Sequence, residues 1–254
     1  MTVWEGLAVL LAGVAAGTIN TIVGSGTLIT FPVLLALGLP PVTANVSNTL
    51  GLVPGSISGA IGYRRELAGQ RRRLLRLGTG SLIGGLLGAW LLVVLPGKAF
   101  GAIVPVLILL ALVLVVLQPR VARAMAARRR ATDGPAPEAG PLLFAGVLLA
   151  GVYGGYFGAA QGVLLLALMG MLLQDDMQRI NATKNVLAVI VNGVAAVFFL
   201  FVADIDWTAV MLIAVGSVAG GQLGARLGRR LPPPVLRSAI VVVGLAAVTR
   251  LLLG

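Results

Sequence analysis

The chain has 254 residues, of which 58% are hydrophobic and 11% charged, and its mean hydropathy is +1.03. This is more apolar surface than a soluble domain of that length can bury, so the composition indicates a membrane protein. Histidine and cysteine are both absent, which excludes disulfides, thiol and imidazole chemistry and the usual zinc or haem sites. We therefore expect no metal site, no cofactor and no enzyme activity.

The formal net charge of +11 would suggest nucleic-acid binding in a soluble protein. Here the arginines gather at the ends of apolar stretches, in groups at 64–76, 118–130 and 226–237. Such clusters are typical of cytoplasmic loops that follow the positive-inside rule. We interpret them as topology signals, with the lipid bilayer and not nucleic acid as partner.

Apolar stretches long enough to enter a membrane follow one another along the whole chain. A span needs about 20 apolar residues, and eight stretches are predicted, at 3–38, 42–63, 74–95, 99–117, 141–173, 180–203, 207–225 and 235–253. The first has no basic leader and no small-residue cleavage site, so we interpret it as a retained span and not as a signal peptide.

Two of these stretches, 3–38 and 141–173, are too long for one ordinary span. Small residues interrupt both, as TINTIVGSGT at 18–27 and as GYFGAAQG at 155–162. Each stretch is predicted to be a broken or re-entrant helix pair, because membranes tolerate non-helical backbone where protein or a watery cavity satisfies its polar groups. The alternative is that the small residues only permit close helix packing.

An internal repeat divides the chain into two halves. GSLIGGLLGA at 80–89 returns as GSVAGGQLGA at 216–225, with seven identical positions and a shift of 136 residues. The glycine spacing inside this segment is typical of a helix interface. The same shift pairs Gly26 with Gly162 and Asn45 with Asn181. We predict a first membrane repeat at 1–117, a cytoplasmic linker at 118–140 and a second membrane repeat at 141–254.

The loop charges predict how the two repeats are oriented. By the same shift, the arginine loop at 64–76 corresponds to the acidic loop that carries Asp204 and Asp206. Equivalent loops of opposite charge indicate opposite sides of the membrane. The predicted fold is an all-α polytopic membrane protein of two inverted repeats, each with a broken helix pair and three transmembrane helices, about ten helices in all. A parallel four-plus-four arrangement is the alternative.

The two breaks are the first candidates for a binding site. Helix N-termini that open inside a membrane present free N–H groups, which favour an anion near the midplane. The candidate residues at the breaks are Gly24, Ser25 and Gly26 in the first repeat and Gln161 and Gly162 in the second.

A polar patch begins nineteen residues after each break. Its members are Asn45, Ser47, Asn48 and Thr49 in the first repeat and Asn181, Thr183, Lys184 and Asn185 in the second. Helix capping explains one such residue per patch but not four. Lys184 is the sharpest candidate, because a cation within the membrane is costly and functional by default. Its alternative is snorkelling to the interface, with Asp175 or Asp176 as partner.

These residues resemble a known family. The passage GTINTIVGSGTLITFPVLLALGLPPVTANVSNTLGLVPGSISGAIGYRREL at 17–67, with NATKNVLAVIVNGVAA at 181–196, is similar to the sulfite exporter TauE/SafE permeases. The resemblance implies a bacterial cytoplasmic membrane protein that exports small sulfur-containing anions such as sulfite, sulfoacetate or other organosulfonates. It also implies that the breaks and patches are the two repeated family motifs, although AAQG at 159–162 replaces a denser glycine run. The absence of cysteine argues against thiosulfate as substrate.

The residues themselves also favour an anionic substrate. One buried cation, two helix openings and clustered amides and hydroxyls suit an oxyanion, whereas a metal cation would need carboxylates. A passive anion channel and a membrane scaffold without transport remain the alternatives. The sequence leaves the oligomeric state open, a homodimer included.

Overall fold

The computed structural model describes residues 1–131, 140–173, 175–227 and 245, and the regular secondary structure of these residues is all helix, with no strand. Nine helices are found in this part of the chain: α1 (Val3–Ile22), α2 (Thr27–Ala36), α3 (Pro41–Gly62), α4 (Arg71–Val94), α5 (Gly97–Ala131), α6 (Pro141–Tyr156), α7 (Gln161–Leu172), α8 (Met177–Val202) and α9 (Trp207–Leu227). Apart from Leu245, the predicted stretch at 235–253 lies outside the described residues.

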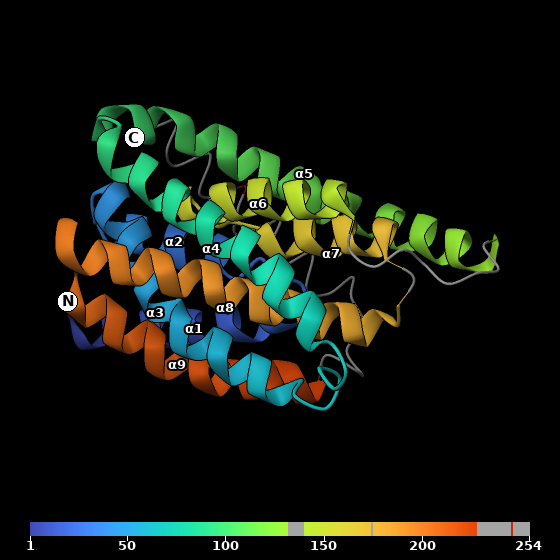
Figure 1. The fold of residues 1–254 in the computed structure, drawn as a ribbon. Helices are drawn as coiled ribbons and strands as arrows, with labels where there is room; N and C mark the ends of the chain where they lie inside the picture. The colour runs from blue at the N-terminus through green and yellow to red at the C-terminus, as the bar shows by residue number, and fades with distance from the viewer. Residues whose placement is uncertain (132–139, 174, 228–244, 246–254) are drawn as a thin grey trace.

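The helices run along one common direction (Figure 1), and several can cross a bilayer. In the described part of the chain five are long and apolar enough to do so, at Val3–Ile22, Arg71–Val94, Gly97–Leu117, Met177–Val202 and Trp207–Leu227. Large apolar side chains also face outward, such as Trp90 at 48% exposed and Leu110 at 46%. A water-soluble protein rarely exposes so much, so the chain is an integral, polytopic membrane protein.

Both predicted breaks are present. The first separates α1 from α2 and the second separates α6 from α7. The backbone turns at glycines with positive φ, 87° at Gly24 and 78° at Gly158, where other residues are strained. The same hydrogen bond closes each turn, from Gly24 N to Ile19 O and from Gly158 N to Tyr153 O.

The counterpart of Gly24 is therefore Gly158, a shift of 134 and not 136 residues. The predicted pairing of Gly26 with Gly162 is wrong by two positions, and Gln161 and Gly162 form the first turn of α7. Helix α7 has 12 residues whereas α2 has 10. These additional residues of α7 bring the shift back to 136 by the start of α8. An ungapped comparison cannot detect two offsets that cancel.

Each half packs its first helix against the fourth helix of the other half, as α1 on α9 and α4 on α6. The repeated glycines lie at these interfaces. A Cβ added to Gly84 would lie 2.2 Å from Leu148 O, and one added to Gly220 would lie 2.1 Å from Val14 O. The repeated segment is thus a close helix interface, as its spacing predicts.

Helix α5 extends beyond the apolar stretch at 99–117 and ends at Ala131. The first part of the predicted linker at 118–140 is therefore helical, because its alanines and arginines are strong helix formers. Residues 132–139 lie outside the described part. The linker boundary at Gln118 marks a change in composition and not the end of a helix.

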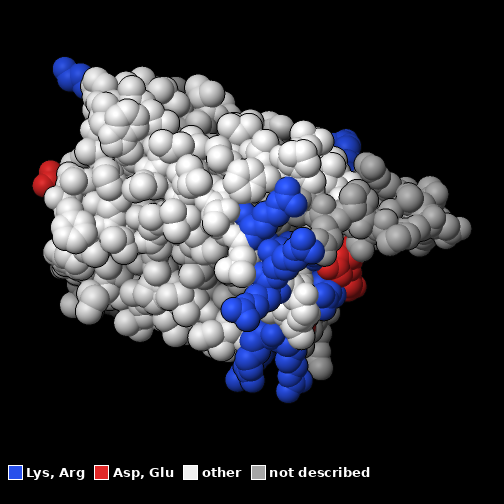
Figure 2. Space-filling model, viewed as in Figure 1, with Lys and Arg blue, Asp and Glu red and all other residues white. Residues whose placement is uncertain are grey.

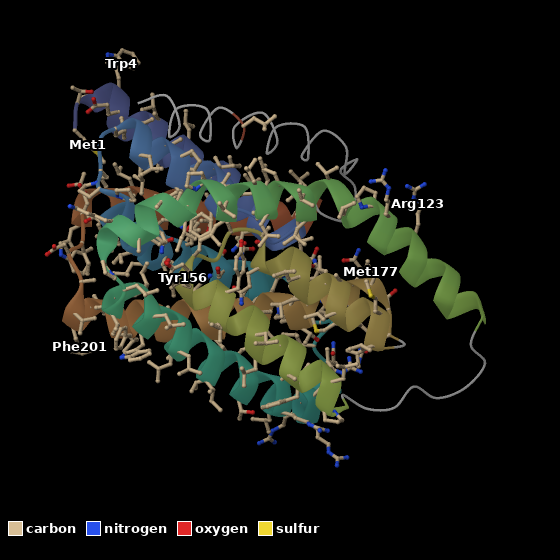
Figure 3. The ribbon with its side chains drawn as sticks, turned by 90° about the horizontal axis from the view of Figure 1, so that it is seen from above. Met1, Trp4, Arg123, Tyr156, Met177 and Phe201 are labelled. Atoms are coloured by element: carbon tan, nitrogen blue, oxygen red, sulfur yellow. The ribbon has the colours of Figure 1, made fainter. Side chains whose placement is uncertain are left out.

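Basic side chains gather at one end of the bundle (Figure 2), where α4 begins and α9 ends. Figure 3 labels Met177 and Arg123 at this end and Met1 and Phe201 at the other, so α8 runs away from the arginine end. Helix α4 begins there with Arg71, Arg72 and Arg73. These arginines and Arg226, in the last turn of α9, thus lie at the same end of the molecule.

Candidate functional site

The two helix breaks contact each other inside the bundle. Gly162 N donates a hydrogen bond of 3.1 Å to Gly24 O. A Cβ on Gly24 would lie 2.3 Å from Gly162 Cα, and a Cβ on Gly162 would lie 2.4 Å from Gly24 Cα. Only a pair of glycines permits this approach. The break residues of the two repeats therefore lie at one location.

Lys184 is buried beside this contact, with 0% of its surface exposed. Its Nζ donates to Asn20 O at 2.9 Å and to Thr21 O at 3.1 Å, in the last turn of α1. That turn carries the negative end of the helix dipole, which favours a cation. The ammonium thus connects the second half to the first half's broken helix.

Two side-chain amides of α8 next to Lys184 also donate to the end of α1. Asn181 Nδ2 and Asn185 Nδ2 each donate to Thr21 O at 3.3 Å. Positions 181, 184 and 185 lie on one helix face, because residues three and four apart are neighbours on a helix surface. Three of the four patch residues in the second repeat therefore meet at the end of α1.

The predicted snorkelling partners of Lys184 are engaged elsewhere. Asp175 pairs with Arg73 at 2.5 Å and with Arg179 at 2.9 Å, and Asp176 accepts from Gln178 N as the N-cap of α8. Within the described part of the chain Lys184 has no carboxylate partner. The snorkelling alternative is wrong, because the side chain points toward the bundle interior.

The first repeat has neutral residues in the same positions. Asn45 Nδ2 donates 3.0 Å to Tyr156 O, the last residue of α6, so it also reaches the opposite half. Asn48 is held within its own half, since its Nδ2 donates 3.2 Å to Thr27 Oγ1 and its Oδ1 accepts from Thr30 Oγ1. Thr49 Oγ1 donates to Asn45 O of its own helix.

Ser47 and Thr183 are predicted site residues whose side chains form hydrogen bonds away from the breaks. Ser47 Oγ accepts from Asp206 N at 2.9 Å, and Thr183 Oγ1 donates to Gln70 Oε1 at 2.8 Å. Asp206 and Gln70 directly precede α9 and α4 and are themselves related by the shift of 136. These hydroxyls hold the starts of two helices and do not join the cluster around Lys184.

Several buried polar atoms around the breaks lack a hydrogen-bond partner. They include Ser25 Oγ, Gln161 Nε2, Asn45 Oδ1 and Asn181 Oδ1, on residues that are 1%, 3%, 1% and 7% exposed. An unsatisfied buried polar group costs about 1–3 kcal/mol. Both hydrogen-bond donors and acceptors are thus available to a polar ligand at this location.

The start of α2 adds further donors. Within the described residues, the backbone N–H groups of Ser25, Gly26 and Thr27 donate no hydrogen bond. The positive end of the helix dipole is therefore open there, as expected for an anion site. The first turn of α7 differs, since Gln161 N donates to Gly158 O and Gly162 N to Gly24 O.

Four residues of the cluster are absent from the sequence-based candidates: Asn20, Thr21, Thr27 and Thr30. Asn20 and Thr21 contribute backbone carbonyls, to which the residue type gives no guide. Thr27 and Thr30 carry a detectable signal, because two hydroxyls three residues apart on an apolar helix after a break share one face.

A bundle whose broken helices meet around a buried ammonium is the architecture of a solute transporter, and comparison with known proteins identifies which kind. The family described as "Sulfite exporter TauE/SafE" matches residues 9–251. The chain belongs to this family. It is a membrane transporter of the TauE/SafE type, as its sequence motifs predict.

Relatives with similar names cover nearly the whole chain. "Probable membrane transporter protein ORF9" of Sinorhizobium sp is 28% identical over 95% of this chain and 90% of its own length. "Probable membrane transporter protein YfcA" of Escherichia coli K12 is 26% identical over 93% and 86%, respectively. "Probable membrane transporter protein YdhB" of Bacillus subtilis is 26% identical over 92% and 93%. The similarity thus extends over both repeats.

Proposed function

We propose that this protein exports small sulfur-containing anions, such as sulfite, sulfoacetate or other organosulfonates, across the bacterial cytoplasmic membrane. The anion binds where the two helix breaks meet. The observation that carries the proposal is Lys184, which is fully buried without a carboxylate partner in the described residues. Its Cδ lies 3.1 Å from the position of a Cβ on Gly162. The family description supports sulfite-like substrates.

Lys184 retains the capacity to bind an anion. An ammonium has three N–H donors, and two of them form hydrogen bonds to Asn20 O and Thr21 O. The third N–H is left for a substrate oxygen, in a charge-assisted hydrogen bond. The carbonyls of α1 hold the ammonium in place, while the free N–H groups at the start of α2 supply neutral donors.

We further propose that the repeats are inverted, with three crossings each and the linker in the cytoplasm. Helix α3 ends shortly before α4 begins at the arginine end, so α3 runs toward that end, whereas its counterpart α8 runs away from it (Figure 3). Reporter fusions after Arg130 and after Gly254 test this arrangement, and opposite readings are expected. Matching readings would instead support the parallel arrangement.

The proposed function is tested by binding and flux with purified protein. A thermal-shift panel of sulfite, sulfonates, sulfate and carboxylates identifies anions that stabilise the folded state. Replacing Lys184 by Met removes the charge with little change in length, and should weaken anion binding by about 1.5–3 kcal/mol. Arg120→Met, at an exposed position of α5, is the charge-matched control.

Flux into liposomes separates the proposal from its alternatives. A carrier shows saturating flux, a passive channel does not saturate at comparable anion concentrations, and a scaffold moves nothing. If Lys184→Met binds and transports like the parent protein, the assignment of the anion site to Lys184 is wrong.

A further inference from the structure

We infer that the transported substrate carries its own hydrogen-bond donor, such as a hydroxyl, an ammonium or an acid proton, next to its anionic group. This inference rests on the proposed function and narrows its substrate class. It is drawn from two acceptor atoms, Asn45 Oδ1 and Asn181 Oδ1, which are enclosed in the protein and have no donor.

In Asn45 and Asn181 the hydrogen bond of the side-chain Nδ2 fixes which way the amide group is turned. Asn45 Nδ2 faces Tyr156 O at 3.0 Å, and Asn181 Nδ2 faces Thr21 O at 3.3 Å. Turning either amide over would place two acceptors face to face, since a carbonyl oxygen only accepts. Each Oδ1 therefore stays an acceptor, on residues that are only 1% and 7% exposed.

The arrangement occurs once in each repeat. Asn45 and Asn181 are related by the shift of 136, and each donates to the last turn of the broken helix of the opposite half. In both repeats the side-chain Oδ1 of this asparagine lacks a hydrogen-bond partner. Such acceptors in both halves, each beside a helix break, point to a ligand that supplies donors.

A fully deprotonated oxyanion does not meet this need. Its oxygens are acceptors and would repel the Asn Oδ1 atoms. An anion with a donor satisfies both kinds of group: its charged oxygens accept from Lys184 Nζ, Ser25 Oγ and Gln161 Nε2, and its O–H or N–H donates to Asn Oδ1. The class that fits comprises hydroxyalkanesulfonates, aminoalkanesulfonates and monoprotonated oxyanions such as bisulfite. Fully ionised sulfoacetate has no donor, so the inference removes it from the substrates proposed above.

Three small sulfonates test the inference on the full-length purified protein. Ethanesulfonate, 2-hydroxyethanesulfonate and 2-aminoethanesulfonate share one sulfonate group. The hydroxyl analogue adds a neutral donor and stays an anion, and the amino analogue adds a charged donor and is a zwitterion at neutral pH. We expect the two donor-bearing ligands to bind about tenfold tighter than ethanesulfonate, because an analogue that lacks the donor leaves buried acceptors unpaired. Equal affinity of all three would overturn the inference and leave the proposed anion transport standing.

Two amides with the same contact provide a matched pair of variants. Asn181 and Asn185 both donate to Thr21 O at 3.3 Å, but only Asn181 carries an enclosed, unpartnered Oδ1. Asn181→Ala should lower the preference for 2-hydroxyethanesulfonate over ethanesulfonate, by about threefold or more. Asn185→Ala should keep that preference, whatever its effect on overall affinity.

An equal fall of the preference in both variants would show that the Oδ1 acceptor is not its source. The ligand series on the parent protein needs no substitution, so a variant that fails to fold leaves the inference testable. If neither the three sulfonates nor sulfite binds, the proposed function falls together with this inference. Binding that Lys184→Met abolishes, without any preference among the ligands, contradicts the inference alone.

Discussion

Positions 48 and 184 are equivalent in the two repeats but hold different residues with different partners. Asn48 is bonded to Thr27 and Thr30 and so fastens α2 to α3 within the first half. Lys184 crosses between the halves to Asn20 O and Thr21 O. By the shift of 134 that relates the two breaks, Gln161 and Leu164 of α7 correspond to Thr27 and Thr30. Leu164 is apolar and Gln161 Nε2 has no hydrogen-bond partner, so neither repeats the contact that Asn48 makes.

The difference shows how a duplicated fold acquires one charged site. The first half keeps a neutral polar contact that stabilises its own broken pair. The second half has given up that contact and uses the same position for a cation, held by the carbonyl end of the opposite helix α1. We therefore expect substitutions in the first half to affect mainly stability and those at Lys184 to affect mainly anion binding.

The largest effect is expected where the two halves meet. Gly24→Ala would place a Cβ 2.3 Å from Gly162 Cα and also strain a backbone at φ 87°. Because backbone on both sides would have to move, we expect a loss of more than about 3 kcal/mol of stability. Thermal unfolding of the purified protein in detergent measures it.

Gly38 provides the matched control for that substitution. Its φ is 86°, but a Cβ there would meet nothing within 4 Å. Gly38→Ala should therefore lower the stability only by the cost of the strained backbone, about 1 kcal/mol. Equal losses in the two variants would show that the contact between the breaks contributes nothing beyond the turn geometry.

The next effect separates the equivalent positions 48 and 184. Asn48→Ala leaves the buried hydroxyls of Thr27 and Thr30 without their amide partner, so stability should fall by about 1–3 kcal/mol. Anion affinity should change less than in Lys184→Met, because both ends of the Asn48 amide are already occupied. Unfolding and anion titration of both variants measure the two quantities, and a larger loss of affinity in Asn48→Ala would reverse our assignment.

The smallest effect concerns the contact between the halves at the arginine end. Burial by itself raises the pKa of the Asp175 carboxyl, but hydrogen bonds from Arg73 and Asp176 N and the charges of Arg73 and Arg179 hold the pKa below its ordinary value of 3.8. A lowered pKa in the folded state means that the pair stabilises the protein above the unfolded pKa. That stabilisation is lost as the pH falls through the folded pKa.

Unfolding of the parent protein and of Asp175→Asn from pH 6 to pH 3 checks this expectation. The parent should be more stable by about 1 kcal/mol or less at the upper end, and the difference should shrink on acidification below the ordinary pKa of 3.8. Asp204→Asn, at an exposed position on the acidic loop, is the control. A difference that stays constant with pH would mean that the charge of Asp175 is not the source of the stabilisation.

The sequence by itself determined the membrane-spanning character, the two breaks and the repeat. These are local or periodic properties: apolar length, small residues at a break, and identity at a fixed shift. It also indicated the polar faces, since Asn181, Lys184 and Asn185 follow helical spacing. The family could be recognised from the same motifs.

The tertiary structure alone decided which partner each polar residue has. Lys184 and Thr183 are adjacent in sequence, yet one reaches the end of α1 and the other the start of α4. The same is true of Ser47 and Asn48, whose side chains go to α9 and α2. Neighbouring residues on a helix point about 100° apart, so the packing of the two halves determines whether a polar side chain lies at the site or holds the start of another helix.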